Sequence, residues 1–335
     1  MTIISKRDRY RGALVGVLAG DALGAPYEWT WTPERIAEDM RARGGLVPHE
    51  YEPFDYIEPF KGKRTVTAGQ PTDDSELAAA LAQSLVAHPE FDPMDLYGRL
   101  RSFIHLRKSI LTTRAYGSGS TLSAALKPEI YQDSLSQFAY GEMPTPPSNG
   151  GLMRCTPAGL RYPGEGIKAA ELGRAQSRVT HRHPQSQAAC AAYAATVSFV
   201  VAELSPSDAW IAACGLLHSA SHDDQALAEV LSVDLSKPDY ERDILGKDDG
   251  VDKKGWAVLS LRAALWAAIN AKDFADGIVK VISLGGDTDT YGAIAGGILG
   301  AHFGIQGIPE KWQGVLQGRE VMIDLADRLY EGAHL

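Results

Sequence analysis

The sequence predicts an all-α protein made of a single domain over residues 1–335. Apolar residues recur at the three- and four-residue steps of an α-helix in many segments, whereas no sustained two-residue alternation typical of a strand is found. No linker separates regions of different composition, and no repeat of fixed period is visible. We therefore expect one all-α domain whose loops converge on one site.

The first expected helix covers residues 9–20 and carries Gly12, Gly16 and Gly20 at four-residue steps. Such a stripe lets another backbone approach closely, at a cost of about 1 kcal/mol per glycine relative to alanine. In chain order, the same periodicity predicts further helices at 75–88, 94–108, 166–179, 185–204, 207–218, 256–270, 274–284, 288–303 and 319–332.

Segments rich in glycine and proline at 43–72, 140–151 and 234–254 are expected to be loops. Loops of this length inside a compact domain are more often functional than decorative. We therefore expect them to contribute to the site.

Charge and cysteine content restrict the partners and the compartment. The formal charge of −9 disfavours a nucleic-acid partner, and the densest basic run, 99–114, is typical of a solvated helix face. Three cysteines without a CxxC pair are typical of a reducing cytosol. No signal peptide is evident, and the most apolar window, 291–305, is too short and glycine-rich to span a bilayer. We expect a cytoplasmic protein without a membrane partner.

Two acidic clusters, "PTDDSEL" and "GGDTDTYG", each stand at the start of an expected helix, about 210 residues apart. Asp73 and Glu76 have the spacing of a capping box, so the first cluster has a purely structural alternative. One cap needs only one carboxylate, whereas the clusters together supply four, and each cluster contains a threonine.

Carboxylate and hydroxyl oxygens are hard ligands that suit Mg²⁺ or Mn²⁺. Four carboxylates crowded without a cation would repel one another, and two divalent ions about 3.5–4 Å apart would relieve that repulsion. We therefore expect the clusters to meet as two halves of a binuclear metal site.

With these motifs in order, the chain resembles the ADP-ribosylglycohydrolase family over nearly its whole length. The matching segments are "GALVGVLAGDALGAPYEW", "TDDSELAAALAQSL", "YGSGSTLSAAL", "SNGGLMRCTPAGL", "THRHP", "KKGWAVLSLRAALWAA" and "LGGDTDTYGAIAGGILGAHFG". The resemblance implies an all-α fold, a single compact orthogonal helical bundle with a binuclear metal cleft formed by loops and helix N-termini. It also implies that the protein binds two Mg²⁺ ions, with Mn²⁺ as the alternative, and hydrolyses the bond between ADP-ribose and its acceptor.

The resemblance also implies the site residues. The implied metal ligands are Thr72, Asp73, Asp74, Asp287, Asp289 and Thr290. Glu28 is expected to be catalytic at the metal centre, and Asp74 or Asp289 is expected to be the general base. Asp21 is interpreted as structural.

Glycine-rich and histidine motifs are expected to bind the substrate. Their residues are Gly117, Ser118 and Gly119, then Ser148, Asn149, Gly150 and Gly151, and His181. On the residues alone, the first group is equally an ordinary glycine turn, and a lone histidine is more often structural. His183 is interpreted as a spectator, and Arg154 is assigned no role.

The acceptor is expected to be arginine, because Trp256 stands at the aromatic position of a lysine-glycine-aromatic stretch and could stack on a guanidinium. Trp256 has the alternative of a core aromatic, and Leu259 stands where arginine-directed relatives often have an acid. The expected substrate is an ADP-ribosylated protein and the expected product ADP-ribose, in opposition to an ADP-ribosyltransferase or toxin. Serine-linked or free ADP-ribose derivatives, a two-metal phosphohydrolase and a non-catalytic relative are the alternatives.

Overall fold

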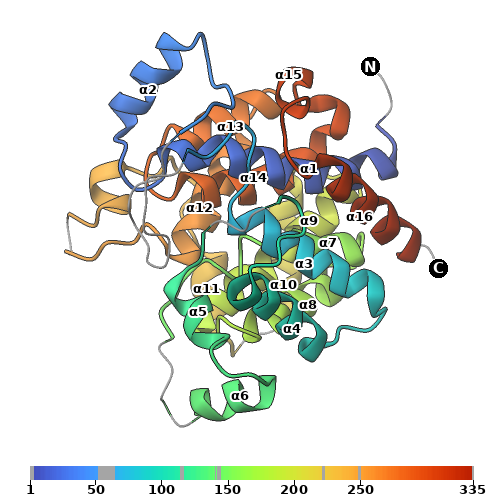
Figure 1. Ribbon diagram of the computed structural model, residues 1–335. Coiled ribbons are helices and arrows are strands. Elements are labelled where there is room, and N and C mark those ends of the chain that lie inside the picture. The colour runs from blue at the N-terminus through green and yellow to red at the C-terminus, as the bar shows by residue number, and fades with distance from the viewer. Residues whose placement is uncertain are drawn as a thin grey trace.

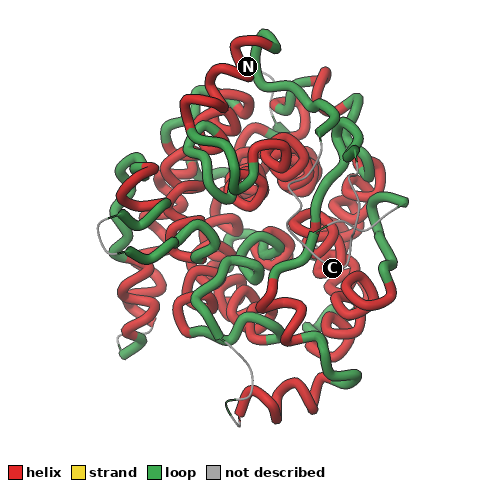
Figure 2. The backbone as a smooth tube through the Cα atoms, turned by 60° about the vertical axis from the view of Figure 1, so that its left-hand side comes forward, coloured by secondary structure: helices red, strands yellow, loops and turns green. Residues whose placement is uncertain are grey.

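Helices dominate the computed structural model, which describes residues 4–51, 65–113, 117–139, 141, 145–220, 223–247 and 250–333 (Figure 1). Within these ranges no strand forms, and isolated antiparallel bridges pair Tyr51 with Val66 and Ser148 with Trp256. Figure 2 accordingly shows helices and loops alone. The predicted all-α fold class is confirmed.

The structure contains the helices that the sequence predicts and several others. In chain order they are α1 (Lys6–Gly24), α2 (Pro33–Ala42), α3 (Asp73–Ala87), α4 (Pro93–Leu106), α5 (Ser120–Ala125), α6 (Tyr131–Ala139), α7 (Thr156–Arg161), α8 (Gly166–Arg178), α9 (Pro184–Val201), α10 (Pro206–Ala220), α11 (Gln225–Leu231), α12 (Ala257–Ile269), α13 (Phe274–Ile282), α14 (Thr288–Phe303), α15 (Glu310–Gln313) and α16 (Arg319–Gly332). Every predicted helix is present within a few residues, whereas α2, α5, α6, α7, α11 and α15 were not predicted.

Short helical turns complete the element order: the 3₁₀ turns η1 (Ala25–Tyr27) and η3 (Ile305–Gly307), and the π-helical turn η2 (Tyr240–Ile244). The turn η2 corrects the prediction of a plain loop over 234–254. Much of the predicted loop 43–72, and smaller parts of 140–151 and 234–254, lie outside the described residues.

Helices α1 and α14 run antiparallel and touch backbone to backbone, and Figure 1 shows them side by side in the upper half of the molecule. A Cβ atom on Gly16 would lie 2.1 Å from the carbonyl oxygen of Gly296, and one on Gly20 would lie 1.9 Å from that of Gly292. Real Cβ contacts essentially never fall below 3.0 Å, so only glycine permits this packing. The expected close backbone approach along the α1 stripe is confirmed.

This packing fixes what lies at the ends of the two helices. Gly24 near the end of α1 lies against Thr288 at the start of α14, whose hydroxyl donates to the Gly24 carbonyl at 2.8 Å. The C-terminal end of α1 and the N-terminal end of α14 are therefore held together, although they are 264 residues apart.

The other helices surround this pair. Helices α3, α7, α9, α13 and α16 contact α1, while α9, α12 and α13 contact α14. One hydrophobic cluster takes in residues from α1 through α16. Among the described residues, no helix is both long enough and apolar enough to cross a membrane.

Candidate active site

Three carboxylates converge where α1 ends and α14 begins. Glu28 follows the turn η1, Asp287 precedes the first residue of α14, and Asp289 lies in the first turn. One side-chain oxygen of each lies within 4.8 Å of the others. Asp287 and Asp289 are buried and Glu28 is half-buried, so the group reaches solvent on the Glu28 side.

A glycine pair makes the approach to α14 possible. Gly285 and Gly286 have φ angles of 71° and 84°, in the left-handed region that favours glycine. The carbonyl of Gly286 accepts a hydrogen bond from the backbone N–H of Trp29 at 2.8 Å, which ties the Glu28 segment to the start of α14.

The cluster at residues 72–76 opens α3, and its helix cap is not the alternative capping box of Asp73 with Glu76. Thr72 is the N-cap, and its hydroxyl accepts from the Asp74 N–H. Glu76 instead accepts from the backbone N–H groups of Ile110 and Leu111. The alternative in which Asp73 and Glu76 form a capping box is therefore wrong, because Thr72 caps the helix and Glu76 binds the backbone of Ile110 and Leu111.

Asp21 fastens α3 to α1. Its buried carboxylate accepts from the Thr72 N–H at 3.0 Å, the Thr72 hydroxyl at 2.9 Å and the Ser75 N–H at 3.0 Å. Burial raises the pKa of Asp21 to about 6, although these hydrogen bonds oppose the rise. The interpretation of Asp21 as structural agrees with these contacts.

The two clusters lie close enough for their charges to act on each other. Burial and the charges of Asp21 and Asp287 raise the pKa of Asp73 to about 7. Burial, followed by the charges of Asp21, Asp73 and Asp287, raises the pKa of Asp74 well above its ordinary value. Burial and the charges of Glu28, Asp74 and Asp287 do the same to the pKa of Asp289. Residues 73–74 and 287–289 thus belong to one electrostatic unit.

The carboxylates of Glu28, Asp73, Asp74, Asp287 and Asp289, called the acidic group below, are able to hold a metal ion. Its donors are all oxygens, as Mg²⁺ and Mn²⁺ prefer. The Oδ1 atom of Asp74 is buried and has no hydrogen-bond partner within the described ranges. A buried acceptor without a partner is costly, and a cation beside it would remove that cost.

The loop before α5 lies against Asp73. A Cβ atom on Gly117, whose φ is 81°, would lie 2.1 Å from Asp73 Oδ1. Ser118 is half-buried, and Gly119 is the exposed N-cap of α5 with open space where a side chain would be. The structure therefore brings Gly117 to the acidic group.

The turn at 148–151 reaches the acidic group through Asn149. The Asn149 Nδ2 donates to Asp287 Oδ2 at 2.7 Å and to the Ser260 hydroxyl at 2.9 Å. Ser148 is half-buried, and its hydroxyl donates to that of Thr121 at 3.1 Å. Asn149 thus orients the carboxylate of Asp287.

His181 lies directly behind the glycines of this turn. A Cβ atom on Gly150 would lie 2.6 Å from His181 Nε2, and one on Gly151 would lie 2.8 Å from the Ser177 hydroxyl. The ring is 2% exposed, and its Nδ1 lies 2.8 Å from the Thr180 hydroxyl. Burial and the charges of Arg154 and Arg182 lower the pKa of His181 well below its ordinary value, so the ring is neutral.

The residue before Trp256, Gly255, lies next to the acidic group. The Trp256 ring is half-buried, and the Lys253 ammonium lies 5.9 Å from its centroid. Gly255 separates Trp256 from Lys254 and lies close to both Trp29 and Asp287. Leu259 is buried in the core.

Sequence reasoning missed three neighbours of the group. Lys254 stabilises the charge of Asp287 and lies 5.3 Å from the Trp29 ring centroid, Trp29 donates to Glu28, and Ser260 holds Asn149. Lys254 and Ser260 belong to the quoted "KKGWAVLS" stretch, and Trp29 follows Glu28 directly, so position in a motif was the available signal.

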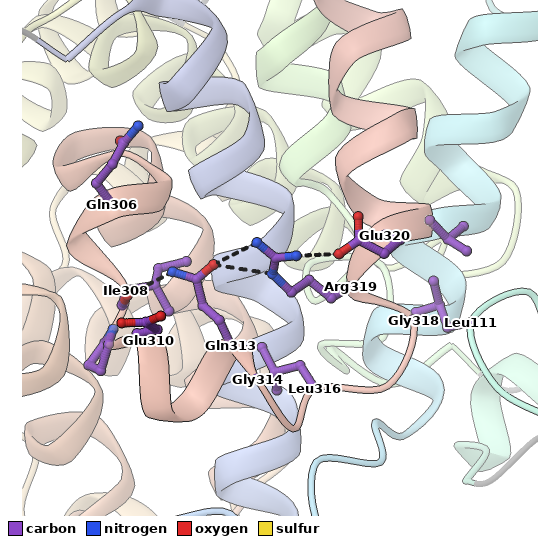
Figure 3. Close-up of a pocket in the computed structure, with 12 residues that line it drawn as sticks. Leu111, Gln306, Ile308, Glu310, Gln313, Gly314, Leu316, Gly318, Arg319 and Glu320 are labelled. Carbon is purple, nitrogen blue, oxygen red and sulfur yellow. Dashed lines mark hydrogen bonds and ion pairs between the residues drawn. The ribbon is translucent and has the colours of Figure 1, made fainter.

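The pocket in Figure 3 is a separate feature. It lies between η3, α15 and α16 beside Leu111, and no predicted site residue lines it. Arg319 there is held by Gln313 and Glu320.

The fold and the acidic group together define an all-helical protein with an oxygen-rich site able to bind metal. The family model described as ADP-ribosylglycohydrolase matches residues 2–335, so the chain belongs to the ADP-ribosylglycohydrolase family. Members of this family hydrolyse glycosidic bonds of ADP-ribose, and the predictions of the family and of a hydrolase are confirmed.

Relatives of the chain support the same assignment. It is 26% identical to the ADP-ribosylhydrolase ARH3 of Mus musculus over 96% of this chain and 91% of the relative. It is 25% identical to the ADP-ribosylarginine hydrolase Tri1 of Serratia proteamaculans (96% and 79%) and 27% identical to the ADP-ribosyl-dinitrogen reductase glycohydrolase of Rhodospirillum rubrum (93% and 91%). A solved structure described as an ADP-ribosylglycohydrolase-related protein complex superposes with a TM-score of 0.66 at 27% identity, covering 98% of this chain and 99% of that chain.

Proposed function

We propose that the protein removes mono-ADP-ribose from arginine side chains of modified proteins. The bond cleaved joins the anomeric carbon of the distal ribose to the acceptor, and free ADP-ribose is the product. The observation that carries the proposal is the convergence of Glu28, Asp287 and Asp289 in front of Asp73 and Asp74, in a chain of this family.

We propose two Mg²⁺ ions as cofactors, with Mn²⁺ as the alternative. The residues that would hold them are Thr72, Asp73, Asp74, Asp287, Asp289 and Thr290. When bound, such ions neutralise the crowded carboxylates, polarise a water and orient the ribose hydroxyls.

The chain's own residues would then position the water and move its proton. Asp74 is our first candidate for the general base, because its Oδ1 is buried without a hydrogen-bond partner in the described ranges. Asp289 is the second, since its Oδ1 already accepts from the Thr290 N–H at 2.8 Å. Asn149 holds Asp287 in one orientation, and Glu28 completes the group from the solvent side.

Arginine as the acceptor is supported by the surroundings of Trp256. The Lys253 ammonium 5.9 Å from the ring centroid marks a face that accepts a cation, and such a contact contributes roughly 0.5–2 kcal/mol. A protein of charge −9 also attracts cationic partners. The relative named ADP-ribosylarginine hydrolase matches over 96% of this chain. The buried Leu259 offers no acid to a guanidinium, so the proposal rests on the indole.

A competition between linkages tests the proposal. Peptides carrying mono-ADP-ribose on arginine or on serine are incubated with the protein and Mg²⁺, and the released nucleotide is identified by mass. We expect intact ADP-ribose, released faster from arginine, and Trp256→Leu should slow the arginine reaction more than the serine reaction. Faster release from serine refutes the acceptor, whereas AMP would identify a phosphohydrolase.

In the cell, this activity would reverse the modification made by an ADP-ribosyltransferase or a toxin. A cytoplasmic location remains part of the proposal, on the evidence of the cysteine content.

A further inference from the structure

A buried arginine lies beneath the glycine turn of the site. Arg154 is 0% exposed, and its guanidinium donates only to neutral oxygens among the described residues. These are the carbonyl of Gly150 at 3.3 Å, the Gln176 Oε1 at 2.9 Å, the Gln176 carbonyl at 3.0 Å and the Thr180 hydroxyl at 2.8 Å. A guanidinium buried without a carboxylate keeps its positive charge to act on its neighbours.

The Thr180 hydroxyl joins Arg154 to His181. A hydroxyl has one hydrogen to donate and two lone pairs to accept with. Arg154 donates to one lone pair, and the only other contact of the hydroxyl in the described chain is His181 Nδ1 at 2.8 Å. If Nδ1 carried a hydrogen, the buried hydroxyl hydrogen would have no acceptor, and such a loss is costly.

The positive charge acts in the same direction. Arg154 and Arg182 are the charged groups that face the ring, and both disfavour an imidazolium. A hydroxyl that accepts from a guanidinium also becomes a stronger donor. The Thr180 hydroxyl therefore donates to Nδ1, and the single ring hydrogen lies on Nε2.

The Nε2 atom faces the position where Gly150 lacks a side chain. A Cβ atom there would lie 2.6 Å from Nε2, so any larger residue would cover this nitrogen. We propose that Arg154 is a positioning residue that acts through Thr180 to hold His181 in its Nε2–H form, so that the neutral ring presents a hydrogen-bond donor to bound ADP-ribose beside Gly150. The identity of the ligand in this inference rests on the proposed function.

Imidazole nitrogen spectra of the full-length protein labelled with ¹⁵N-histidine test the inference directly. His183 is an internal reference, because its Nδ1 accepts from the Gln185 N–H at 3.2 Å and must lack a hydrogen. The His181 signal is assigned from its absence in His181→Gln. We expect the Nε2–H pattern for His181 near pH 6 and pH 8, and an Nδ1–H or charged ring at either pH overturns the inference.

Two variants at Thr180 separate the hydroxyl from its bulk. Thr180→Val removes the donor to Nδ1 at nearly constant shape, so the Nδ1 signal should change, either by losing its hydrogen-bonded shift or by gaining a hydrogen, whereas Thr180→Ser should retain the wild-type pattern. A Thr180→Val spectrum equal to that of the wild type would contradict the relay.

Calorimetric titration with ADP-ribose tests the second half of the inference. Thr180→Val should weaken binding about ten-fold and Thr180→Ser about two-fold or less. A changed Thr180→Val spectrum with unchanged affinity overturns the role of the Nε2–H group in ligand binding. A wild-type protein that does not bind ADP-ribose refutes the proposed function, while the spectra still decide the tautomer.

Discussion

Asp73 and Asp289 show how a single residue is placed for chemistry instead of stability. Each lies in the first turn of its helix, where an acidic side chain is favoured, yet each is buried among like charges. Within the described residues neither forms an ion pair with a basic side chain, and such burial is costly unless a cation is present.

We therefore expect Asp73→Asn and Asp289→Asn to abolish hydrolysis while the fold remains intact, because each removes charge from the cation site. Turnover at saturating Mg²⁺ and circular dichroism measure the two properties. Asp208→Asn is the matched control, since Asp208 lies exposed in the first turn of α10. Retention of more than about a tenth of wild-type activity by either site variant would contradict the metal assignment.

Glu28 and His181 differ in what they contact, so their loss should affect different constants. Glu28 lies among the carboxylates, whereas His181 lies behind Gly150. We expect Glu28→Ala to lower turnover more than affinity for ADP-ribose, and His181→Ala to weaken affinity more than turnover. Calorimetry together with initial rates measures both, and an exchange of the two effects would refute these roles.

Helices α1 and α14 show at the next scale how packing creates the site. Their contact consists of glycine against glycine backbone at successive turns, and it ends where Glu28 meets Asp287. The stripe of small residues is thus the structural reason that carboxylates far apart in the chain meet.

Gly16→Ala and Gly296→Ala should strongly destabilise the protein, because the new Cβ would lie 2.1 Å and 2.0 Å from a facing carbonyl oxygen. Overpacking of this kind costs about 1–3 kcal/mol or more, against a gain of about 1 kcal/mol in helix propensity. Denaturant titration measures the loss. Gly215→Ala in the exposed interior of α10, where a Cβ meets nothing within 4 Å, should be neutral or stabilising. Equal stability of all three variants would contradict the tight packing.

The helices also show what a sequence can reveal. Long helices such as α9 were predictable because small and apolar residues, chiefly alanine, extend over several turns. Helix α2 was missed although Thr32 and Pro33 form a good start signal, because only Ile36 and Met40 are buried along it. Such a short apolar face gives little periodicity.

The acidic clusters were visible as motifs, but their supports were not. The bond of Asp21 to Thr72 spans 51 residues, and that of Asn149 to Asp287 spans 138. Neither has a local pattern, because each depends on how separate helices pack. For the same reason the role of Arg154 could not be inferred before its contacts with Gly150 and Thr180 were known.

For the whole molecule, the site is a concentration of negative charge inside one connected hydrophobic cluster, which we interpret as one domain. Without metal, this charge opposes folding. Burial, with neighbouring charges, raises the pKa of Asp73 to about 7, and burial raises those of Asp21 and Asp287 to about 6, against an ordinary value of 3.8.

The sign of the pH effect follows from these values. A raised pKa means that the folded chain binds more protons than the unfolded chain, so the stability of the metal-free protein falls as pH rises. For Asp73 the loss begins near its ordinary pKa of 3.8 and is complete above its folded value of about 7. On the proposed metal assignment, Mg²⁺ would bind only the folded site and should restore stability, by about 2.7 kcal/mol at a hundred times its Kd.

Comparison of the wild type with Asp73→Asn isolates the contribution of Asp73 to the pH dependence of stability, because the other titrating groups are common to both proteins. In EDTA we expect Asp73→Asn to be the more stable protein near pH 8, since it lacks one crowded charge, and its advantage should shrink near pH 5. With saturating Mg²⁺ near pH 8 the order should reverse, because the variant has lost a ligand. Thermal unfolding across these conditions provides the measurement. A wild type that is already more stable than Asp73→Asn near pH 8 in EDTA would show that the carboxylates do not repel one another, and the electrostatic argument for a cation at this site would fail.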